Sequence, residues 1–261
     1  MTQLSDNRNT LELATNRALV ADVAIYAAEK MYAGGMIAID SGGEMDMASD
    51  TLGLRVLGRC PKYVDNTADG EKSNIEHGVF RYENSSTYAI TQKMIGQVCY
   101  VEDDNTVGAG STNLVAAGII KDVDSSGVWV DQSLEALAVS RALARTKVVS
   151  VTDTTYTALA TQAFQGNVIL ACDNASGVVV TLPSAVAGYR LGVQRTAATA
   201  AHDVTLTAAS GDTVRGSTAA GTAANTTDAV SGILYLECES ATAWVDASPI
   251  AADRASWTPS T

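Results

Sequence analysis

Residues 78–131 form a series of short β-favouring runs separated by polar turn sequences. The runs cover residues 79–82, 97–101, 116–123 and 128–131, and the breaks between them include Asp-Asp-Asn and Asp-Ser-Ser-Gly. Strands this short, separated by turn-forming residues, are typical of antiparallel all-β structure. We therefore expect an all-β protein.

The composition favours thin β layers over a deep ligand cavity. Of the 261 residues, 46% are hydrophobic but only 5% are aromatic, so Val, Ile, Leu and Ala must build the cores. The formal net charge of −12 repels phosphate backbones, and we expect no nucleic-acid partner. No run approaches the ~20 apolar residues that a membrane-spanning helix needs. We expect no membrane partner and see no signal peptide.

Charge is distributed unevenly along the chain. Residues 1–150 contain 13 basic residues (Lys and Arg) and 20 acidic residues (Asp and Glu). Residues 151–261 contain only 4 basic and 9 acidic residues. Such a change in composition usually separates two modules. We predict an N-terminal arm (1–31), a small β-barrel (32–132), a linker helix (133–147), a second, antiparallel β-sandwich-like module (148–250) and an extended tail (251–261).

The linker segment has the clearest helical pattern in the chain. Ser133 is suited to cap the first turn, and Arg141, Arg145 and Lys147 favour the negative end of the helix dipole. With helical spacing, one face of this helix should dock against the protein. That face comprises Leu134, Leu137, Ala138 and Arg141.

The first 74 residues give weaker signals. Residues 11–30 are compatible with a helix, but their polar and β-branched residues favour an extended arm, which is our prediction. Strands are expected at 36–40 and 44–47 around a glycine-containing hairpin loop, and at 54–60 before Pro61. Residues 64–74 are polar and are predicted to form a loop.

The second module contains several β-rich runs between Gly-, Pro- and Asn-containing breaks. No repeat of fixed period is apparent, which argues against a long solenoid. The runs cover residues 148–152, 167–171, 178–182, 191–195, 203–207, 233–237 and 243–246.

Histidine chemistry has little support in this sequence. A Ser-His-Asp site needs a histidine as base, and only His77 and His202 are present, without a Gly-x-Ser-x-Gly motif. We interpret both as solvated loop residues. We predict no catalytic and no cofactor-binding residues, and hence no enzyme.

Residues 122–127 resemble the start of a calcium-binding loop. Asp122, Asp124 and Gly127 fit the D-x-D-x-S-G pattern, but Ser133 stands at the twelfth position, where a bidentate Glu is required. A β-hairpin turn explains the same residues. We also interpret the acidic residues 102–105 as a turn whose side chains cap local N–H groups. We predict no metal site.

The cysteines and tryptophans are most simply structural. The four cysteines are widely spaced without a Cys-x-x-Cys pair, which is typical of a reducing compartment and buried thiols. Trp129, Trp244 and Trp257 suit core or interface anchors better than sugar-stacking platforms. The cysteines are Cys60, Cys99, Cys172 and Cys238.

The order of three phrases resembles a phage family. GVFRYENSSTYAIT, IGQVCYVEDDNTV and AAGIIKDVDSSGVWVD, in this order, are similar to the β-barrel proteins that decorate or cement tailed-phage capsids. The resemblance spans residues 32–131. DNASGVVVTLPSAVAGYRLGVQR and HDVTLTAASGDTVRG further resemble modules of phage fibres and head-surface proteins, which commonly associate around a three-fold axis.

The resemblance implies a virion protein on the capsid exterior that binds the major capsid protein and itself, as a homotrimer, and stabilises the head against DNA pressure. The basic residues Arg55, Arg59 and Lys62 form either a charged, protected sheet edge or a patch for an acidic capsid surface. An alternative function is a fibre or adhesin subunit that binds host glycans. A glycan hydrolase, which needs paired carboxylates in a cleft, ranks last.

Overall fold

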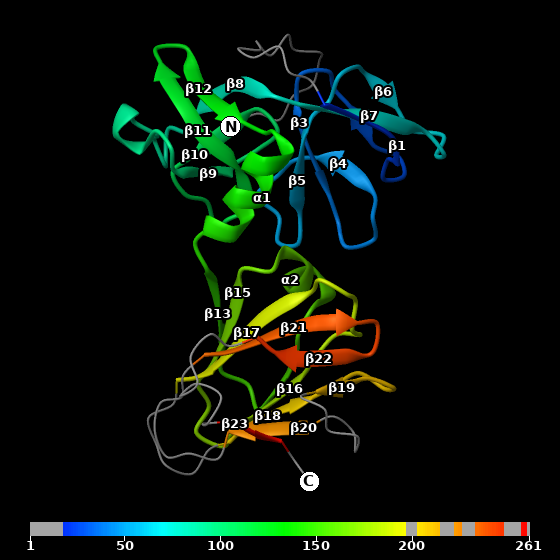
Figure 1. Cartoon of the computed structure of the whole chain (residues 1–261), viewed down its shortest axis with the longest axis vertical. Helices are drawn as coiled ribbons and strands as arrows, with labels where there is room; N and C mark the ends of the chain where they lie inside the picture. The colour runs from blue at the N-terminus through cyan, green and yellow to red at the C-terminus, as the bar shows by residue number, and fades with distance from the viewer. Residues whose placement is uncertain (1–17, 197–202, 215–221, 226–232, 248–256, 260–261) are drawn as a thin grey trace. The chain divides into compact units, whose positions relative to one another are not determined.

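The computed structural model describes the chain except for residues 1–17, 197–202, 215–221, 226–232, 248–256 and 260–261 (Figure 1). The chain divides into two compact units, Met1–Arg145 and Thr146–Thr261. Sheets build both units, and the all-β prediction is confirmed. Within the described residues, neither α-helix is long and apolar enough to cross a membrane.

The first unit begins with a five-stranded antiparallel sheet. Its order is β1 (Ala18–Ala24), β7 (Lys72–His77), β5 (Arg55–Arg59), β3 (Met36–Ile39) and β4 (Met45–Met47). A two-stranded ribbon, β2 (Lys30–Met31) and β6 (Val64–Asp65), accompanies it. The β3–β4 hairpin forms where predicted, because the Asp40 carboxylate accepts hydrogen bonds from the Gly42 and Glu44 amides.

The second half of this unit is a closed barrel of five short strands. Its order is β10 (Thr106–Gly108), β8 (Val79–Asn84), β12 (Gly127–Asp131), β11 (Ala116–Asp124) and β9 (Val98–Val101). Strands β8, β9, β11 and β12 lie where the sequence predicts strands at 79–82, 97–101, 116–123 and 128–131, whereas β10 was not predicted. The parallel pair β10–β8 closes the barrel.

Alternation along the barrel strands separates the core from the surface. Phe80, Tyr82, Val128 and Val130 are buried in the barrel. The Tyr82 hydroxyl donates a hydrogen bond to Oε1 of Gln132 over 2.8 Å. Burying these four side chains on one face fixes the strand register, since a slip by one residue would expose all of them.

Helix α1 (Leu134–Leu143) belongs to the first unit. The Ser133 side chain caps it by accepting from the Ala136 amide, as predicted, but it ends before Arg145 and Lys147. Its buried residues are Ala136, Leu137 and Ser140, and it packs on β11 and β9. Of the predicted docking face, Leu137 is buried and the Arg141 guanidinium donates to the Val56 carbonyl over 3.4 Å. Leu134 and Ala138 are exposed, so the prediction is wrong for them. The helix covers the barrel instead of serving only as a linker.

Three other expectations for the first unit need correction. Residues 18–24 do not form an arm but pair with β7 as strand β1. The predicted loop at 64–74 contains β6 and the start of β7. Residues 32–132, predicted as one barrel, form two structures. The five-stranded sheet ends at His77, and the closed barrel starts at Val79. Long-range pairing orders these polar segments despite their weak local propensity.

The second unit contains two sheets whose first strands run parallel. One sheet has the order β13 (Lys147–Val151), β15 (Val168–Cys172), β17 (Arg190–Arg195), β21 (Leu234–Ser240), β22 (Ala243–Asp246) and β19 (Thr213–Val214). The other has the order β14 (Thr155–Thr157), β16 (Val178–Thr181), β18 (Val204–Thr207), β20 (Thr222–Asn225) and β23 (Trp257–Pro259). Helix α2 (Ala160–Gln165) links β14 to β15 (Figure 1).

The expected antiparallel arrangement is wrong for the first half of this unit. The chain alternates between the two sheets, so that β13, β15 and β17 pair in parallel, as do β14, β16 and β18. Lys147 pairs with Val168, 21 residues later, and Ile169 pairs with Gly192, 23 residues later. Because this spacing varies, no fixed repeat is visible in the sequence. In the predicted tail, residues 257–259 form β23, and the others lie outside the described residues.

Candidate functional site

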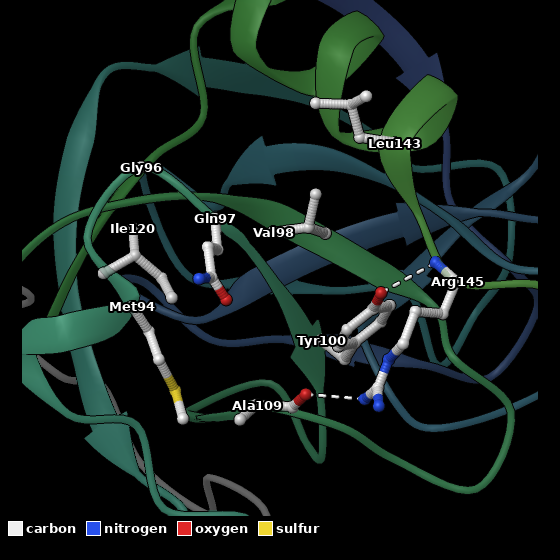
Figure 2. Close-up of a pocket in the computed structure, with 9 residues that line it drawn as sticks. All are labelled: Met94, Gly96, Gln97, Val98, Tyr100, Ala109, Ile120, Leu143 and Arg145. Carbon is white, nitrogen blue, oxygen red and sulfur yellow. Dashed lines mark hydrogen bonds between the residues drawn. The ribbon is translucent and has the colours of Figure 1, made fainter.

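The candidate site is a hollow of about 540 Å³ on the barrel, beside the last turn of α1 (Figure 2). Strands β9 and β11, the short helix η1 (Gln92–Met94) and the segment after α1 contribute to it. The lining residues are Met94, Gly96, Gln97, Val98, Tyr100, Ala109, Ile120, Leu143 and Arg145.

Arg145 is held against one wall of the hollow. Its amide donates to the Tyr100 hydroxyl over 2.8 Å, and its guanidinium donates to the Ala109 carbonyl over 2.6 Å. The guanidinium also lies 5.1 Å from the centre of the Tyr100 ring, within cation–π range. Figure 2 shows these contacts joining the segment after α1 to β9 and to the residue after β10. The positive charge of this wall is thereby fixed in position.

Exposed apolar side chains continue the hollow onto the surface. Leu143 is 64% exposed and Ile95, between two lining residues, is 46% exposed. Val139, one helical turn before Leu143, is 47% exposed. Leu143 extends from the end of α1 at the margin of the hollow (Figure 2). Exposed apolar side chains beside a hollow are suited to protein contacts.

The chemistry of the lining favours binding. The nine lining residues carry no carboxylate, imidazole, thiol, amine or aliphatic hydroxyl. Gln97 offers two amide N–H donors and a carbonyl acceptor, and Arg145 supplies a cation. The hollow can therefore accept an apolar protein segment and hydrogen-bond its backbone.

The structure places the two histidines outside this hollow. His77 ends β7 and is only 3% exposed, so the expectation of a solvated loop residue is wrong for it. Its position in an inner strand of the first sheet explains the burial. His202 lies outside the described residues.

The hairpin-turn interpretation of residues 122–127 is confirmed. Asp124 pairs with Gly127 at the end of the β11–β12 hairpin. One Asp124 oxygen accepts from the Ser126 amide over 2.6 Å, and the other accepts from the Trp129 indole N–H over 2.8 Å. These donors, chiefly the indole, lower the pKa of the Asp124 carboxyl. Local donors therefore occupy the carboxylate that we weighed as a calcium ligand.

The acidic segment 102–105 also forms a turn, between β9 and β10. The Asp103 carboxylate accepts from the Asn105 amide over 2.9 Å, as expected for local capping. Among the residues that the structure describes, no three His, Cys, Asp or Glu side chains are grouped so that they could hold a metal ion.

Arg55, Arg59 and Lys62 form neither a protected edge nor a shared patch. Strand β5 lies between β7 and β3, inside the sheet. Arg59 is buried, with an ion pair to Glu76 and its guanidinium 4.2 Å from the centre of the Phe80 ring. Lys62 is exposed beyond the strand. Both interpretations of this cluster required β5 to present its basic residues to solvent.

The tryptophans differ from one another in their surroundings. Trp244 is fully buried and donates to the Pro183 carbonyl over 3.2 Å, which confirms its predicted role as a core anchor. Trp129 is half-buried on the barrel hairpin, 5.9 Å from the guanidinium of Arg81. The structure does not describe the side chain of Trp257.

The predicted burial of the cysteines is confirmed. All four thiols are free and buried. Burial raises the pKa of Cys60 and Cys238 to about 11 and that of Cys99 and Cys172 to about 12. They are protonated at neutral pH and therefore poor nucleophiles.

Sequence reasoning did not find the hollow. Tyr100 and Arg145 are 45 residues apart, and only barrel closure together with the packing of α1 brings them into contact. The sequence pointed to Arg145 only as a basic residue that would interact with the negative end of the helix dipole.

Comparison with known proteins adds no relative. No known protein family matches the sequence, and no curated protein is significantly similar to it.

Proposed function

We propose that this chain is a structural protein of a tailed phage, which binds the outer surface of the capsid as a decoration, or cement, protein. The observation that carries the proposal is the largely apolar hollow beside α1, lined in part by the exposed Leu143 and adjacent in sequence to the exposed Ile95. The phrases of residues 32–131 that resemble capsid-decorating barrels support the same assignment.

In this proposal the hollow receives a segment of the major capsid protein. Apolar area removed from water contributes ~25 cal/mol per Å², and the Leu143 and Ile95 side chains supply such area. The anchored guanidinium of Arg145 favours a segment with carbonyl or carboxylate groups nearby. Because its contacts to Ala109 and Tyr100 hold it in place, binding orders little additional side chain.

The mechanism is adhesion. Several copies that touch neighbouring capsid subunits gain effective concentration, so modest contacts add up to firm attachment. A protein that binds neighbouring capsid subunits at once holds them together against the outward pressure of packaged DNA. The net charge of −12 suits the exterior of the shell, where the chain does not meet the phosphate backbone.

The test is sedimentation of the purified chain with empty, expanded heads of the phage that carries the gene. We expect stoichiometric binding, lost in Leu143→Glu because a charge would be buried in the contact. Leu159→Glu is the matched control, because Leu159 is similarly exposed (51%) but lies in the second unit.

Failure of the wild-type chain to bind heads would overturn the proposal. Binding to host cells or to their envelope polysaccharide in place of heads would favour the alternative, a fibre or adhesin subunit. Equal loss of binding in both variants would show that the hollow is not the contact.

A further inference from the structure

Strand β13 has an open side. It lies at the edge of its sheet and pairs with β15. On the β15 side, the Lys147 amide donates to the Asn167 carbonyl, and the Val151 carbonyl accepts from the Asp173 amide, both over 2.8 Å. Since successive residues of a strand direct their backbone groups to opposite sides, Val148 and Ser150 direct theirs to the open side.

The other strands at the ends of sheet orders in the described chain carry features that discourage further pairing. Strand β1 contains a bulge, with Asp22 at a φ of 62°. Strand β4 has three residues, one of them Asp46, and β14 also has three. Strands β2, β6 and β19 have only two residues each. Strand β23 ends at Pro259. Charges, bulges, proline and short length are the usual protections of sheet edges.

Strand β13 lacks these protections over Val148–Val151. This stretch contains no charge, proline or glycine, its pairing with β15 is regular, and Val148 is 58% exposed. Three of its four residues are valine, which favours strand pairing. An edge of this kind is a template for another strand.

The sequence around β13 is complementary to itself. Antiparallel pairing centred on Ser150 places Val148 opposite Thr152 and Val149 opposite Val151 of a second copy. Lys147 then lies opposite Asp153, once at each end of the ladder. The open-side groups of Val148 and Ser150 fall in the hydrogen-bonded positions of this register. The same register therefore pairs the open-side backbone groups of Ser150, places Val149 opposite Val151 and brings opposite charges together at both ends. Thr152 and Asp153 follow the end of β13, and the Thr152 carbonyl also accepts from the Asn174 side chain.

We propose that two copies of this chain associate through β13 in an antiparallel ladder centred on Ser150. The contact is isologous, since each copy uses the same surface. It joins copies in pairs, in contrast to the three-fold association that the resemblance implies. It does not depend on the proposed attachment to capsids, because the partner is the chain itself.

A charge exchange in the full-length chain tests the register. Lys147→Glu and Asp153→Lys each place like charges opposite one another twice per dimer, and we expect the dissociation constant to rise about tenfold. The double variant restores opposite charges and should dimerise like the wild type. Asp203→Lys, at an exposed site of the same unit outside β13, is the control. Sedimentation velocity across a concentration series gives the dissociation constants.

Ser150→Pro provides a second measurement. It removes the two central N–H donors of the ladder but leaves the β15 side intact, so we expect a monomer with unchanged circular dichroism. A wild-type monomer or trimer, a double variant that fails to recover, or a dimer that tolerates Ser150→Pro would each overturn the proposal. Slow amide exchange at Ser150 in a wild-type monomer would show that the chain itself covers the edge, and would also overturn it.

Discussion

Arg59 and Glu76 lie directly opposite one another on β5 and β7 and form a buried ion pair. The Arg59 Nε–H donates to Glu76 Oε2 over 3.1 Å, and a second guanidinium nitrogen contacts the same oxygen. Each side chain is only about one-tenth exposed, and the guanidinium covers the Phe80 ring. The pair connects the sheet to the first strand of the barrel.

Removing one member of this pair should destabilise the first unit strongly. Glu76→Gln leaves the Arg59 charge buried without its counter-charge, and we expect a loss of ~3–5 kcal/mol in the free energy of unfolding. Urea unfolding followed by circular dichroism measures the change. Arg190→Ala breaks the more exposed pair with Glu237 and should cost at most ~1 kcal/mol. Equal effects of the two substitutions would contradict the prediction.

Gly127 should not tolerate a side chain. Its φ is +150°, and a Cβ would lie 2.2 Å from the Tyr82 carbonyl oxygen of the neighbouring strand. Gly127→Ala therefore combines backbone strain with a backbone clash, and we expect a loss of at least ~3 kcal/mol in the free energy of unfolding. Gly43→Ala, also at positive φ but with open space around its Cβ, should lose only ~1–2 kcal/mol. Urea midpoints of the two variants provide the comparison.

The buried thiols make stability depend on alkaline pH. The unfolded chain releases these protons near pH 9, whereas burial holds the pKa of Cys60 at about 11. The stability that the protonated thiol contributes is fully present below pH 9 and is lost as the pH rises from about 9 to about 11. In this window the thiol of the unfolded chain has lost its proton, whereas that of the folded chain still holds it, so deprotonation favours unfolding. We expect the urea midpoint to fall over this window, and to fall less in Cys60→Ala. A thiol reagent that modified the folded chain at neutral pH would contradict this account.

The hydrogen bond between Asp124 and Trp129 predicts a titration at acid pH. The indole N–H lowers the pKa of the Asp124 carboxyl, so the bond persists as the pH falls through the ordinary aspartate value of 3.8 and is lost only below it. The NMR resonance of the Trp129 indole N–H should report this step, and Asp124→Asn should abolish it. Addition of calcium should leave the resonance unmoved; a shift would show that the hairpin binds the metal.

Local sequence was sufficient for four of the five barrel strands and for the helix start. Alternation in residues 79–82 and 128–131, together with turn residues between the runs, predicted these strands, but β10 was not predicted. Ser133 marked the start of α1 because capping depends on the adjacent backbone. Strand formation and helix capping follow from local backbone preferences, whereas the pairing of β8 with β12 joins residues far apart in the chain, such as Tyr82 and Val128, 46 residues later.

The candidate site was not predictable in the same way. Arg145 was recognised as a helix-terminal charge, but its contacts with Tyr100 and Ala109 exist only after the barrel closes. Arg59 was interpreted as a surface residue because β5 gives no local sign that strands pair on both its sides. Burial of a charged side chain depends on its neighbours in space.

The amino-acid sequence by itself determined the class of this protein, since β-favouring runs and turn residues act through local backbone preferences. The tertiary structure alone decided that 18–24 is a sheet strand, that β13, β15 and β17 are parallel, and that an apolar hollow opens beside α1. Parallel neighbours are joined across connections of more than a dozen residues, so their pairing follows from packing of the whole unit and leaves no local signature.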